Sequence, residues 1–338
     1  MNKLIILSTA LLLSVFASAQ PDDTKSLQQT ARSFMQSGDF NNAIIVLNRA
    51  LQTDKNSLEL QKDLAMTYYL KQDYTKAYEV VKQIVDREDA DVPVFQIAGN
   101  VYRAIEMVKE CDKMYKKALK KFPNSGPLYS EYGELLWQKK DFAAINYWEK
   151  GIELDPSYGG NYYNAAMFYY YTKDKVWSLI YGEIFANMES LSERGAAMKE
   201  LLYKSYKEKL FTDADIMKGE EKNKNEFSKA FLTTMGKEAA MVTTGINTEV
   251  ITMVRTKFIL DWFNTYAGKF PYKLFDFQQQ LIKDGLFDAY NQWLFGSVED
   301  LAAYESWTKT NADDYKKFTT FQKSRIFKMP AGQHYQGN

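Results

Sequence analysis

The chain of 338 residues contains one cysteine, Cys111, and one histidine, His334. A single cysteine excludes a disulfide bond within the chain, so the fold must be stabilised by packing. One cysteine and one histidine cannot build a zinc site of the usual kind. The sequence also has no glycine-rich phosphate loop, calcium loop or nucleophile elbow. We therefore expect no metal, no cofactor and no catalytic residue, and we predict that the protein is not an enzyme.

Proline and glycine are scarce, at 7 and 17 residues. This composition favours long helices with short turns over a β-sandwich or a disordered chain. Lys plus Arg equals Asp plus Glu at 43 each, so no overall positive field draws the protein to nucleic acid or to an anionic membrane. The 24 Tyr and 21 Phe residues suit helical cores and protein-contact surfaces.

The N-terminus has the pattern of a cleavable export signal. Lys3 precedes an almost wholly apolar run at residues 4–16, and Ala17-Ser18-Ala19 supplies a small-residue cleavage site. An apolar run of about 13 residues is shorter than the roughly 20 that a membrane span needs. No cysteine follows the cleavage site, so the pattern is not that of a lipoprotein. Residues 1–19 therefore predict an exported protein, periplasmic or secreted, with no transmembrane segment in the mature chain.

An internal repeat of about 34 residues runs through the first half of the chain. Small residues recur in one column at spacings of 34, 34 and 33, namely Ala43, Ala77, Cys111 and Ala144. About two helical turns later, on the same helix face, lie Ala50, Ile84, Ala118 and Gly151. Two earlier columns hold Ala31, Ala65, Gly99 and Gly133, then Phe34, Tyr68, Tyr102 and Leu136. Small side chains at fixed positions let backbones approach closely, which predicts stacked helical hairpins.

The hairpin turns are marked by an acidic residue followed by an aromatic one, at Gly38-Asp39-Phe40, Gln72-Asp73-Tyr74 and Lys140-Asp141-Phe142. Over residues 24–190 these columns resemble the tetratricopeptide repeat family. A fifth, degenerate unit keeps Tyr162, Ala165, Ala166, Tyr169, Ser178, Gly182 and Phe185. The resemblance implies an all-α fold: a right-handed α-solenoid of helical hairpins, followed by an irregular helical C-terminal region. It also implies that the first helices line a groove that binds a protein or peptide.

The register of the family places one set of side chains in that groove: Lys62, Tyr69, Gln96, Asn100, Arg103, Glu134, Trp137, Tyr163 and Tyr170. Met66, Ser130 and Met167 share the register, although the two methionines equally suit packing between hairpins. Some family members hold a C-terminal carboxylate with Lys, Asn and Arg. Asn100 and Arg103 resemble part of that set, but Gln28 and Arg32 replace the expected Lys and Asn, so this ligand is not predicted.

The second half keeps helical patterning without the repeat. We expect helices over residues 191–211, from Thr212-Asp213 to Met235, over residues 250–266 and over residues 275–295 with a break near Gly285. A further helix should start at Ser297, and the last should end near Phe327. These helices either continue the solenoid or form a compact closing domain, and we favour irregular helices that extend and cap the array. The expected domains are 1–19, 20–190, 191–328 and a flexible tail at 329–338.

Three side-chain groups bear on catalytic chemistry. His334 lies in the polar tail and is expected to be solvated, while Cys111 occupies a small-residue column and is expected to be a buried structural thiol. Asp284 and Asp288 share a helix face, but a glycosidase pair needs a cleft and one raised pKa. We interpret both as surface carboxylates.

The sequence favours an exported, non-catalytic scaffold that binds a protein or peptide in its groove, in bacterial cell-envelope assembly or secretion. The first alternative is a self-assembling envelope protein, a homo-oligomer paired through C-terminal aromatic surfaces. The second is a hydrolase in the C-terminal half, which requires a pocket with convergent carboxylates. No nucleic-acid partner is expected.

Overall fold

The computed structural model describes residues 24–337 apart from 173, 213–214, 221 and 244. All regular structure in these residues is helical, so the expected all-α fold is confirmed. The predicted signal peptide, residues 1–19, lies outside the described residues. Across the described part of the chain, none of the helices has both the length and the apolar character that a membrane span requires. The chain divides into two compact units, described here as unit 1 (24–90) and unit 2 (91–337).

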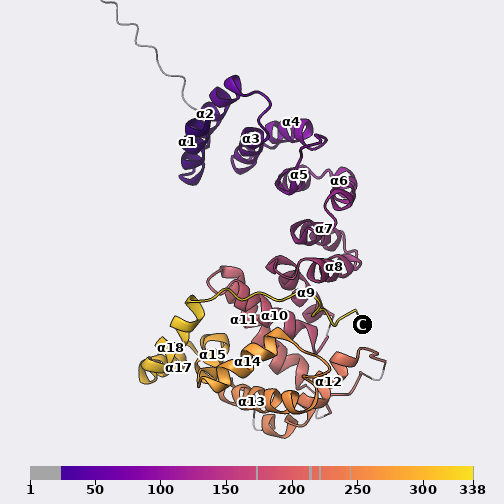
Figure 1. Ribbon diagram of the computed structural model, residues 1–338, viewed down its shortest axis with the longest axis vertical. Helices are drawn as coiled ribbons and strands as arrows, with labels where there is room; N and C mark the ends of the chain where they lie inside the picture. The colour runs from indigo at the N-terminus through magenta and orange to yellow at the C-terminus, as the bar shows by residue number, and fades with distance from the viewer. Residues whose placement is uncertain (1–23, 173, 213–214, 221, 244, 338) are drawn as a thin grey trace, which may run out of the picture. The chain divides into compact units, whose positions relative to one another are not determined.

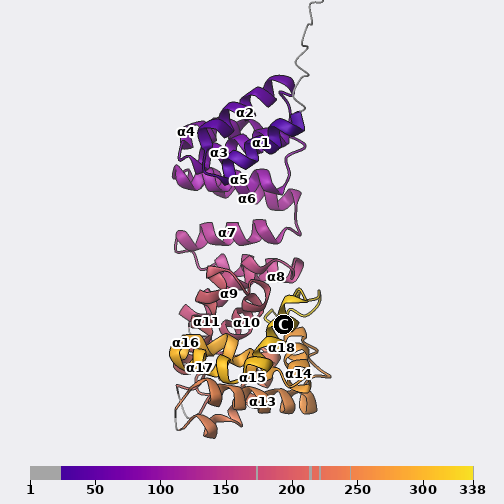
Figure 2. The same ribbon diagram turned by 90° about the vertical axis from the view of Figure 1, so that its left-hand side faces the viewer.

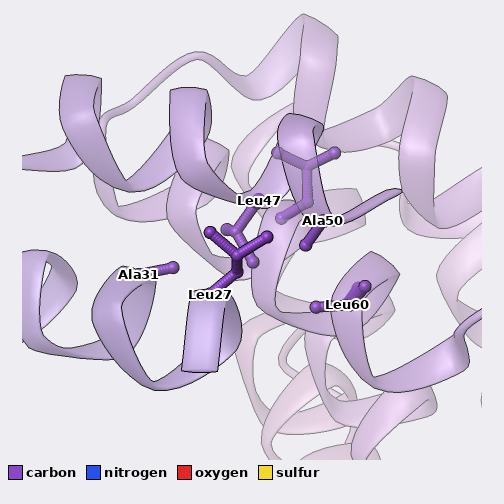
Figure 3. Close-up of a cluster of buried hydrophobic side chains, with 6 residues drawn as sticks. Leu27, Ala31, Leu47, Ala50 and Leu60 are labelled. Carbon is purple, nitrogen blue, oxygen red and sulfur yellow. The ribbon is translucent and has the colours of Figure 1, made fainter. Parts of the chain in front are cut away.

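Unit 1 consists of two helical hairpins (Figure 1). Its helices are α1 (Thr24–Gln36), α2 (Phe40–Thr53), α3 (Leu58–Leu70) and α4 (Tyr74–Ile84). Asp39, Ser57 and Asp73 cap α2, α3 and α4 by accepting a backbone N–H with their side chains. Figure 3 shows the core between α1, α2 and α3, formed by Leu27, Ala31, Leu47, Ala50, Leu60 and Leu64. The hairpins are amphipathic and bury their apolar faces against one another.

Unit 2 begins with three further hairpins (Figure 2). Their helices are α5 (Val92–Ala104), α6 (Val108–Lys121), α7 (Gly126–Gln138), α8 (Ala144–Leu154), α9 (Gly159–Tyr171) and α10 (Trp177–Met188). Each first helix contacts the next, α5 with α7 and α7 with α9. The first-helix side chains of successive hairpins therefore adjoin one another, as a solenoid requires.

The turn inside each of the first four hairpins contains one residue in the left-handed region. These residues are Gly38 (φ 78°), Gln72 (φ 65°), Glu106 (φ 59°) and Lys140 (φ 58°). They follow one another at intervals of 34 residues, so the repeat fixes a backbone conformation as well as a side-chain pattern. Only the first position carries glycine, which adopts positive φ without steric cost.

The small-residue columns lie where helices touch. Ala43, Ala77, Cys111 and Ala144 are all fully buried. Cys111 is buried, as expected, and this burial raises the pKa of its thiol to about 12. At Gly133 of α7 the contact is close, because a Cβ there would lie 2.3 Å from Nε1 of Trp148 in α8.

The C-terminal helices pack without a repeat. They are α11 (Glu193–Ser205), α12 (Glu226–Gly236), α13 (Thr248–Thr265), α14 (Lys273–Lys283), α15 (Phe287–Asn291), α16 (Ser297–Glu299), α17 (Leu301–Thr310) and α18 (Ala312–Lys323). Two π-helical turns, η1 (Tyr206–Leu210) and η3 (Gln292–Gly296), extend α11 and α15, and a short 3₁₀ turn, η2 (Ala239–Val242), follows α12. The predicted break at Gly285 is present, with a φ of 68°.

Two sequence predictions for this region are wrong in their bounds. No helix starts at Thr212; the described residues before α12 form turns, and Asn225 caps α12 through Ser228 N–H. A helix does start at Ser297, as predicted, but it ends at Glu299, and α17 begins at Leu301, where the Asp300 side chain accepts the Ala303 N–H. The last helix ends at Lys323, before Phe327.

A buried ion pair joins helices distant in sequence. Arg255 of α13, 1% exposed, donates to the carboxylate of Glu183 in α10 and to the side chain of Asn291 in α15. Gln278 and Tyr290 also donate to Glu183 Oε1, at 2.6 and 2.7 Å. The Arg255 cluster thus ties α10 to α13, α14 and α15, and its carboxylate has enough donors to be stable without water.

The C-terminal segment, residues 329–337, leaves α18 and returns to the hairpins, ending beside α8 and α9 (Figure 1). The expectation of a solvated His334 is wrong. Its Nε2 lies 2.6 Å from Oε2 of Glu149 in α8, and both side chains are largely buried. The expected flexibility of this tail, like the expected domain boundary at residue 190, stays a prediction.

Candidate partner-binding face

The predicted groove residues of unit 2 lie on α5, α7 and α9, on the side where these helices adjoin. We call this surface the first-helix face. Its predicted members are Gln96, Asn100, Arg103, Ser130, Glu134, Trp137, Tyr163 and Tyr170. Gln96, Asn100 and Arg103 follow one another at intervals of four and three residues, which puts all three on one face of α5.

Polar contacts connect α5 to α7 along this face. The Arg103 guanidinium donates to Glu134 Oε2 at 3.2 Å and to Asn100 Oδ1 at 2.8 Å. Gln96 Nε2 donates to Glu131 Oε1 at 2.8 Å. All five of these side chains are half-buried rather than fully exposed, so their positions are held by neighbours before any partner binds.

The same network continues from α7 to α9. Asn164 Nδ2 donates to Ser130 Oγ and to Glu134 Oε1, both at 3.1 Å. The Glu134 carboxylate therefore accepts hydrogen bonds from a guanidinium of α5 and from an amide of α9. The result is a row of alternating guanidinium, carboxylate and amide groups, which suits hydrogen bonding to the main chain and polar side chains of an extended peptide.

Glu131 and Asn164 belong to this network but were not among the predicted residues. Each follows a predicted position by one residue, after Ser130 and Tyr163 respectively. Burial raises the pKa of the Glu131 carboxyl, and hydrogen bonds from Gln96 and Tyr115 partly offset that rise. The sequence could have indicated both residues, because each is polar and directly follows a predicted groove position. The family register selects one position on each helix turn, however, and so did not include them.

The aromatic members of the face make different contacts. Trp137 packs against Phe142, Trp148 and Phe168, with ring centroids 5.7, 6.3 and 5.4 Å apart. Phe142 at the hairpin turn keeps 60% of its surface exposed. The Trp137 ring is therefore anchored in an aromatic cluster that opens to solvent, as contact residues at protein interfaces often are.

Tyr163 and Tyr170 of α9 are tied to later elements. The Tyr163 ring lies 4.9 Å from that of Phe185 and 5.4 Å from the Arg194 guanidinium. The Tyr170 hydroxyl donates to Glu208 Oε2 in η1 at 3.2 Å. Both rings are half-buried, so they extend the first-helix face toward α11.

In unit 1, the predicted pair Lys62 and Tyr69 lies on α3. Lys62 is 7% exposed, and its Nζ pairs with Glu59 Oε1 at 2.5 Å. Tyr69 is half-buried beside the Tyr74 ring at 5.8 Å. Lys62 is therefore largely buried, and its role in partner binding stays a prediction.

The first helix of unit 1 carries the two residues that replace the carboxylate-binding pair. Gln28 and Arg32 of α1 both donate to Asp63 Oδ2, at 2.7 and 2.9 Å. Their donors are therefore directed at a carboxylate of the chain itself, on the neighbouring α3.

The two carboxylates considered for catalysis are both exposed. Asp284 accepts from Gln280 Nε2 at 2.8 Å, while Asp288 lies beside a surface hollow lined by Trp307. Neither has the burial that a general acid requires. Among the residues that the structure describes, three or more His, Cys, Asp or Glu side chains do not gather into a cluster that could hold a metal ion.

The stacked hairpins, the buried small-residue columns and the shared turn conformation define an α-helical repeat protein. Residues 34–98 match the family model described as tetratricopeptide repeat. This match supports the resemblance of the hairpins to the tetratricopeptide repeat family and covers a minor part of the chain.

Solved structures of other repeat proteins are similar to parts of the chain. TTC0263, a thermophilic tetratricopeptide repeat protein of Thermus thermophilus, is 14% identical with a TM-score of 0.46 and covers 53% of this chain and 99% of its own. PilF of Pseudomonas aeruginosa is 19% identical with a TM-score of 0.47 and covers 54% of this chain and 83% of its own. No curated protein sequence matches the chain.

Proposed function

We propose that the protein is an exported, non-catalytic scaffold whose first-helix face binds an extended segment of a partner protein. The observation that supports this most is the polar row formed by Arg103, Glu134 and Asn164. Its groups bond to one another across three helices, so little conformational entropy remains to be lost when a partner binds. The anchored Trp137 beside it supplies apolar contact area.

The predicted signal at residues 1–19 would direct this scaffold to the cell envelope or outside the cell. Assembly or secretion of surface proteins is the role that this location and a peptide-binding face would serve together. The aromatic anchors and the alternating charges favour a partner segment with both apolar and polar side chains.

The test compares three full-length forms of the mature protein in affinity purification from native envelopes, read by mass spectrometry. They are the wild type, Arg103→Glu and Lys113→Ala, which alters an exposed position on the second helix α6. The charge reversal should lose a specific partner by at least about tenfold, because it places like charges opposite one another. Lys113→Ala should retain that partner.

Circular dichroism of all three forms establishes that the helices are intact. A crosslinkable residue at Trp137 should then capture the same partner. Identical partner recovery by Arg103→Glu and the wild type would remove the first-helix face from the proposal.

Self-assembly is the second candidate, supported by exposed apolar side chains on the C-terminal helices. Leu260 on α13 is 50% exposed and Leu301 on α17 is 60% exposed. A homo-oligomer would cover such residues. Light scattering of the wild type and of a Leu260→Ser/Leu301→Ser variant decides it: a dimer lost in the variant supports pairing, and a wild-type monomer at high concentration ends the idea.

A further inference from the structure

The C-terminal segment contacts the rest of unit 2 as a bound peptide contacts a receptor. Tyr335 provides the anchor. Its ring stacks on Phe227 with centroids 5.0 Å apart and an interplanar angle of 16°, and it also meets Phe270 and Tyr272 at 5.5 and 5.8 Å. Its hydroxyl donates to the Pro271 carbonyl at 2.9 Å. An aromatic ring is thus held on three sides with its polar tip satisfied.

Asn225 binds the main chain of the same segment. Its Nδ2 donates to the Tyr335 carbonyl at 2.6 Å and to the Gln336 carbonyl at 3.2 Å. Its Oδ1 meanwhile accepts the Ser228 N–H at 2.8 Å and caps α12. The cap fixes the amide, and an amide that binds two successive carbonyls recognises an extended backbone whatever its side chains are.

Glu149 contacts His334, the residue before Tyr335. The carboxylate accepts from the hydroxyls of Tyr169 and Tyr181 at 2.7 and 2.8 Å, and Oε2 lies 2.6 Å from Nε2 of His334. Glu149 is 7% exposed although it lies on a second helix of the repeat. A buried carboxylate that faces an imidazole favours a ligand with a cationic or hydrogen-donating side chain at this position.

We propose that Glu149, Asn225 and the Phe227–Phe270–Tyr272 ring cage form a second peptide-binding site, which the chain's own residues 333–336 occupy. It accepts an extended segment of a partner protein in which a histidine or a cation precedes an aromatic residue. None of its residues belongs to the first-helix face. The tail therefore acts as an intramolecular competitor, and a partner segment binds when it displaces the tail.

The geometry separates this site from an ordinary packed terminus. Each of its three parts binds a different feature of the segment. The ring cage packs against an aromatic side chain, Asn225 donates to two main-chain carbonyls, and Glu149 accepts from a hydrogen-bond donor. The segment from 333 to 335 has no helix of its own, so its position depends on these side-chain contacts. Beside it, Ile145, Asn146 and Lys150 of α8 line a surface hollow together with Gln336 and Gly337.

The experiment uses a fluorescent peptide of residues 329–338 and full-length protein in an anisotropy titration. The full-length Tyr335→Ala variant has a weakened tail but an unaltered receptor. It should bind the peptide at least about tenfold more tightly than the wild type does, because the tethered wild-type tail competes at a high effective concentration. A full-length His334→Asp variant, which places a carboxylate against Glu149, should behave in the same way.

Asn225→Asp in the Tyr335→Ala background is the decisive change. Aspartate keeps an acceptor for the α12 cap but loses the donor to both carbonyls, so peptide affinity should fall by about tenfold or more. Asn264→Asp, at an exposed position of α13, adds the same charge and should leave affinity unchanged. A peptide with Ala at the Tyr335 position should not bind.

Two outcomes would overturn the proposal. One is the absence of saturable binding to both tail variants while circular dichroism shows that they are folded. The other is equal affinity for the wild type, the tail variants and the Asn225→Asp double variant, which would mean that the peptide binds elsewhere.

Discussion

The early hairpins and the later helices of unit 2 bury their surfaces with different residues. Between α5 and α8 the helix contacts depend on the absence of side chains, as at Gly99, which faces Tyr115, and Gly133, which faces Trp148. Between α11 and α18 they depend on large rings, such as Phe227, Trp262 and Phe275, and on the Arg255 cluster. Close contacts at small residues therefore repeat along the sequence, whereas the ring and charge contacts of the later helices join positions that no period connects.

The largest expected effect lies in the later helices. Arg255→Met leaves Glu183 buried with an uncompensated charge, so the free energy of unfolding should fall by about 3–5 kcal/mol. Chemical denaturation monitored by circular dichroism measures the loss. Arg32→Met, which removes an exposed pair with Asp63, should cost only about 0–1 kcal/mol.

The double variant Arg255→Met/Glu183→Met separates an unpaired charge from lost packing. With both charges removed, most of the stability should return. A double variant as unstable as Arg255→Met alone would show that the remaining polar groups of the cluster, including Gln278 and Tyr290, need the carboxylate themselves.

The matching test in the hairpins is Gly133→Ala. The added Cβ would lie 2.3 Å from Trp148 Nε1, which already donates to the Ser130 carbonyl at 3.0 Å. Overpacking should lower the free energy of unfolding by about 1–3 kcal/mol. Gly268→Ala is the control, because a Cβ at Gly268 meets no atom within 4 Å. Equal stability of the two variants would contradict the close-approach explanation.

Asp174 lies between the two regions, at the start of α10. It caps this helix by accepting the Val176 and Trp177 N–H groups at 2.8 and 2.6 Å. Burial raises the pKa of its carboxyl to about 6, with a smaller contribution from Glu220 and Glu149. The folded protein therefore binds this proton more tightly than the unfolded chain does. The resulting stabilisation is complete below about pH 4 and is lost as the pH rises through about 6.

Asp174→Asn keeps the cap and removes the titration. Between pH 4 and pH 7 the wild type should lose on the order of 1–2 kcal/mol of unfolding free energy relative to this variant. Denaturant titrations at several pH values measure the difference. Parallel pH profiles for the two proteins would show that Asp174 has the same pKa in the folded and unfolded states.

The sequence predicted the hairpins well because their contacts repeat. Ala43, Ala77, Cys111 and Ala144 revealed the helix-facing column, and the polar row at Gln96 and Arg103 lies on the predicted helix face. It could not predict the Arg255 cluster, since Glu183 and Arg255 are separated by 72 residues with no motif between them. The contact of His334 with Glu149 could not be predicted for the same reason, because no sequence pattern links a histidine near the C-terminus to a distant partner.

The start of α12 shows a different reason for error. Residues 212–225 contain many charged residues with high helix propensity, and the sequence therefore predicted a helix there. The Asn225 cap is instead fixed by contacts with the C-terminal segment, so tertiary structure overrides local propensity. Predictions that use only the neighbours in sequence fail where a distant segment sets the boundary.

The smallest expected change in stability concerns the hairpin turns. The repeat requires a positive φ there, and among these positions only Gly38 adopts it without steric cost. Gln72→Gly and Lys140→Gly should each stabilise the protein by about 0.5–1 kcal/mol, the strain relieved minus the greater entropy of glycine in the unfolded chain. Gly38→Ala should destabilise it by a similar amount. Thermal unfolding of the three variants measures the changes. If Lys140→Gly lowered the melting temperature while Gly38→Ala raised it, the shared turn conformation would not be the reason for the glycine at position 38.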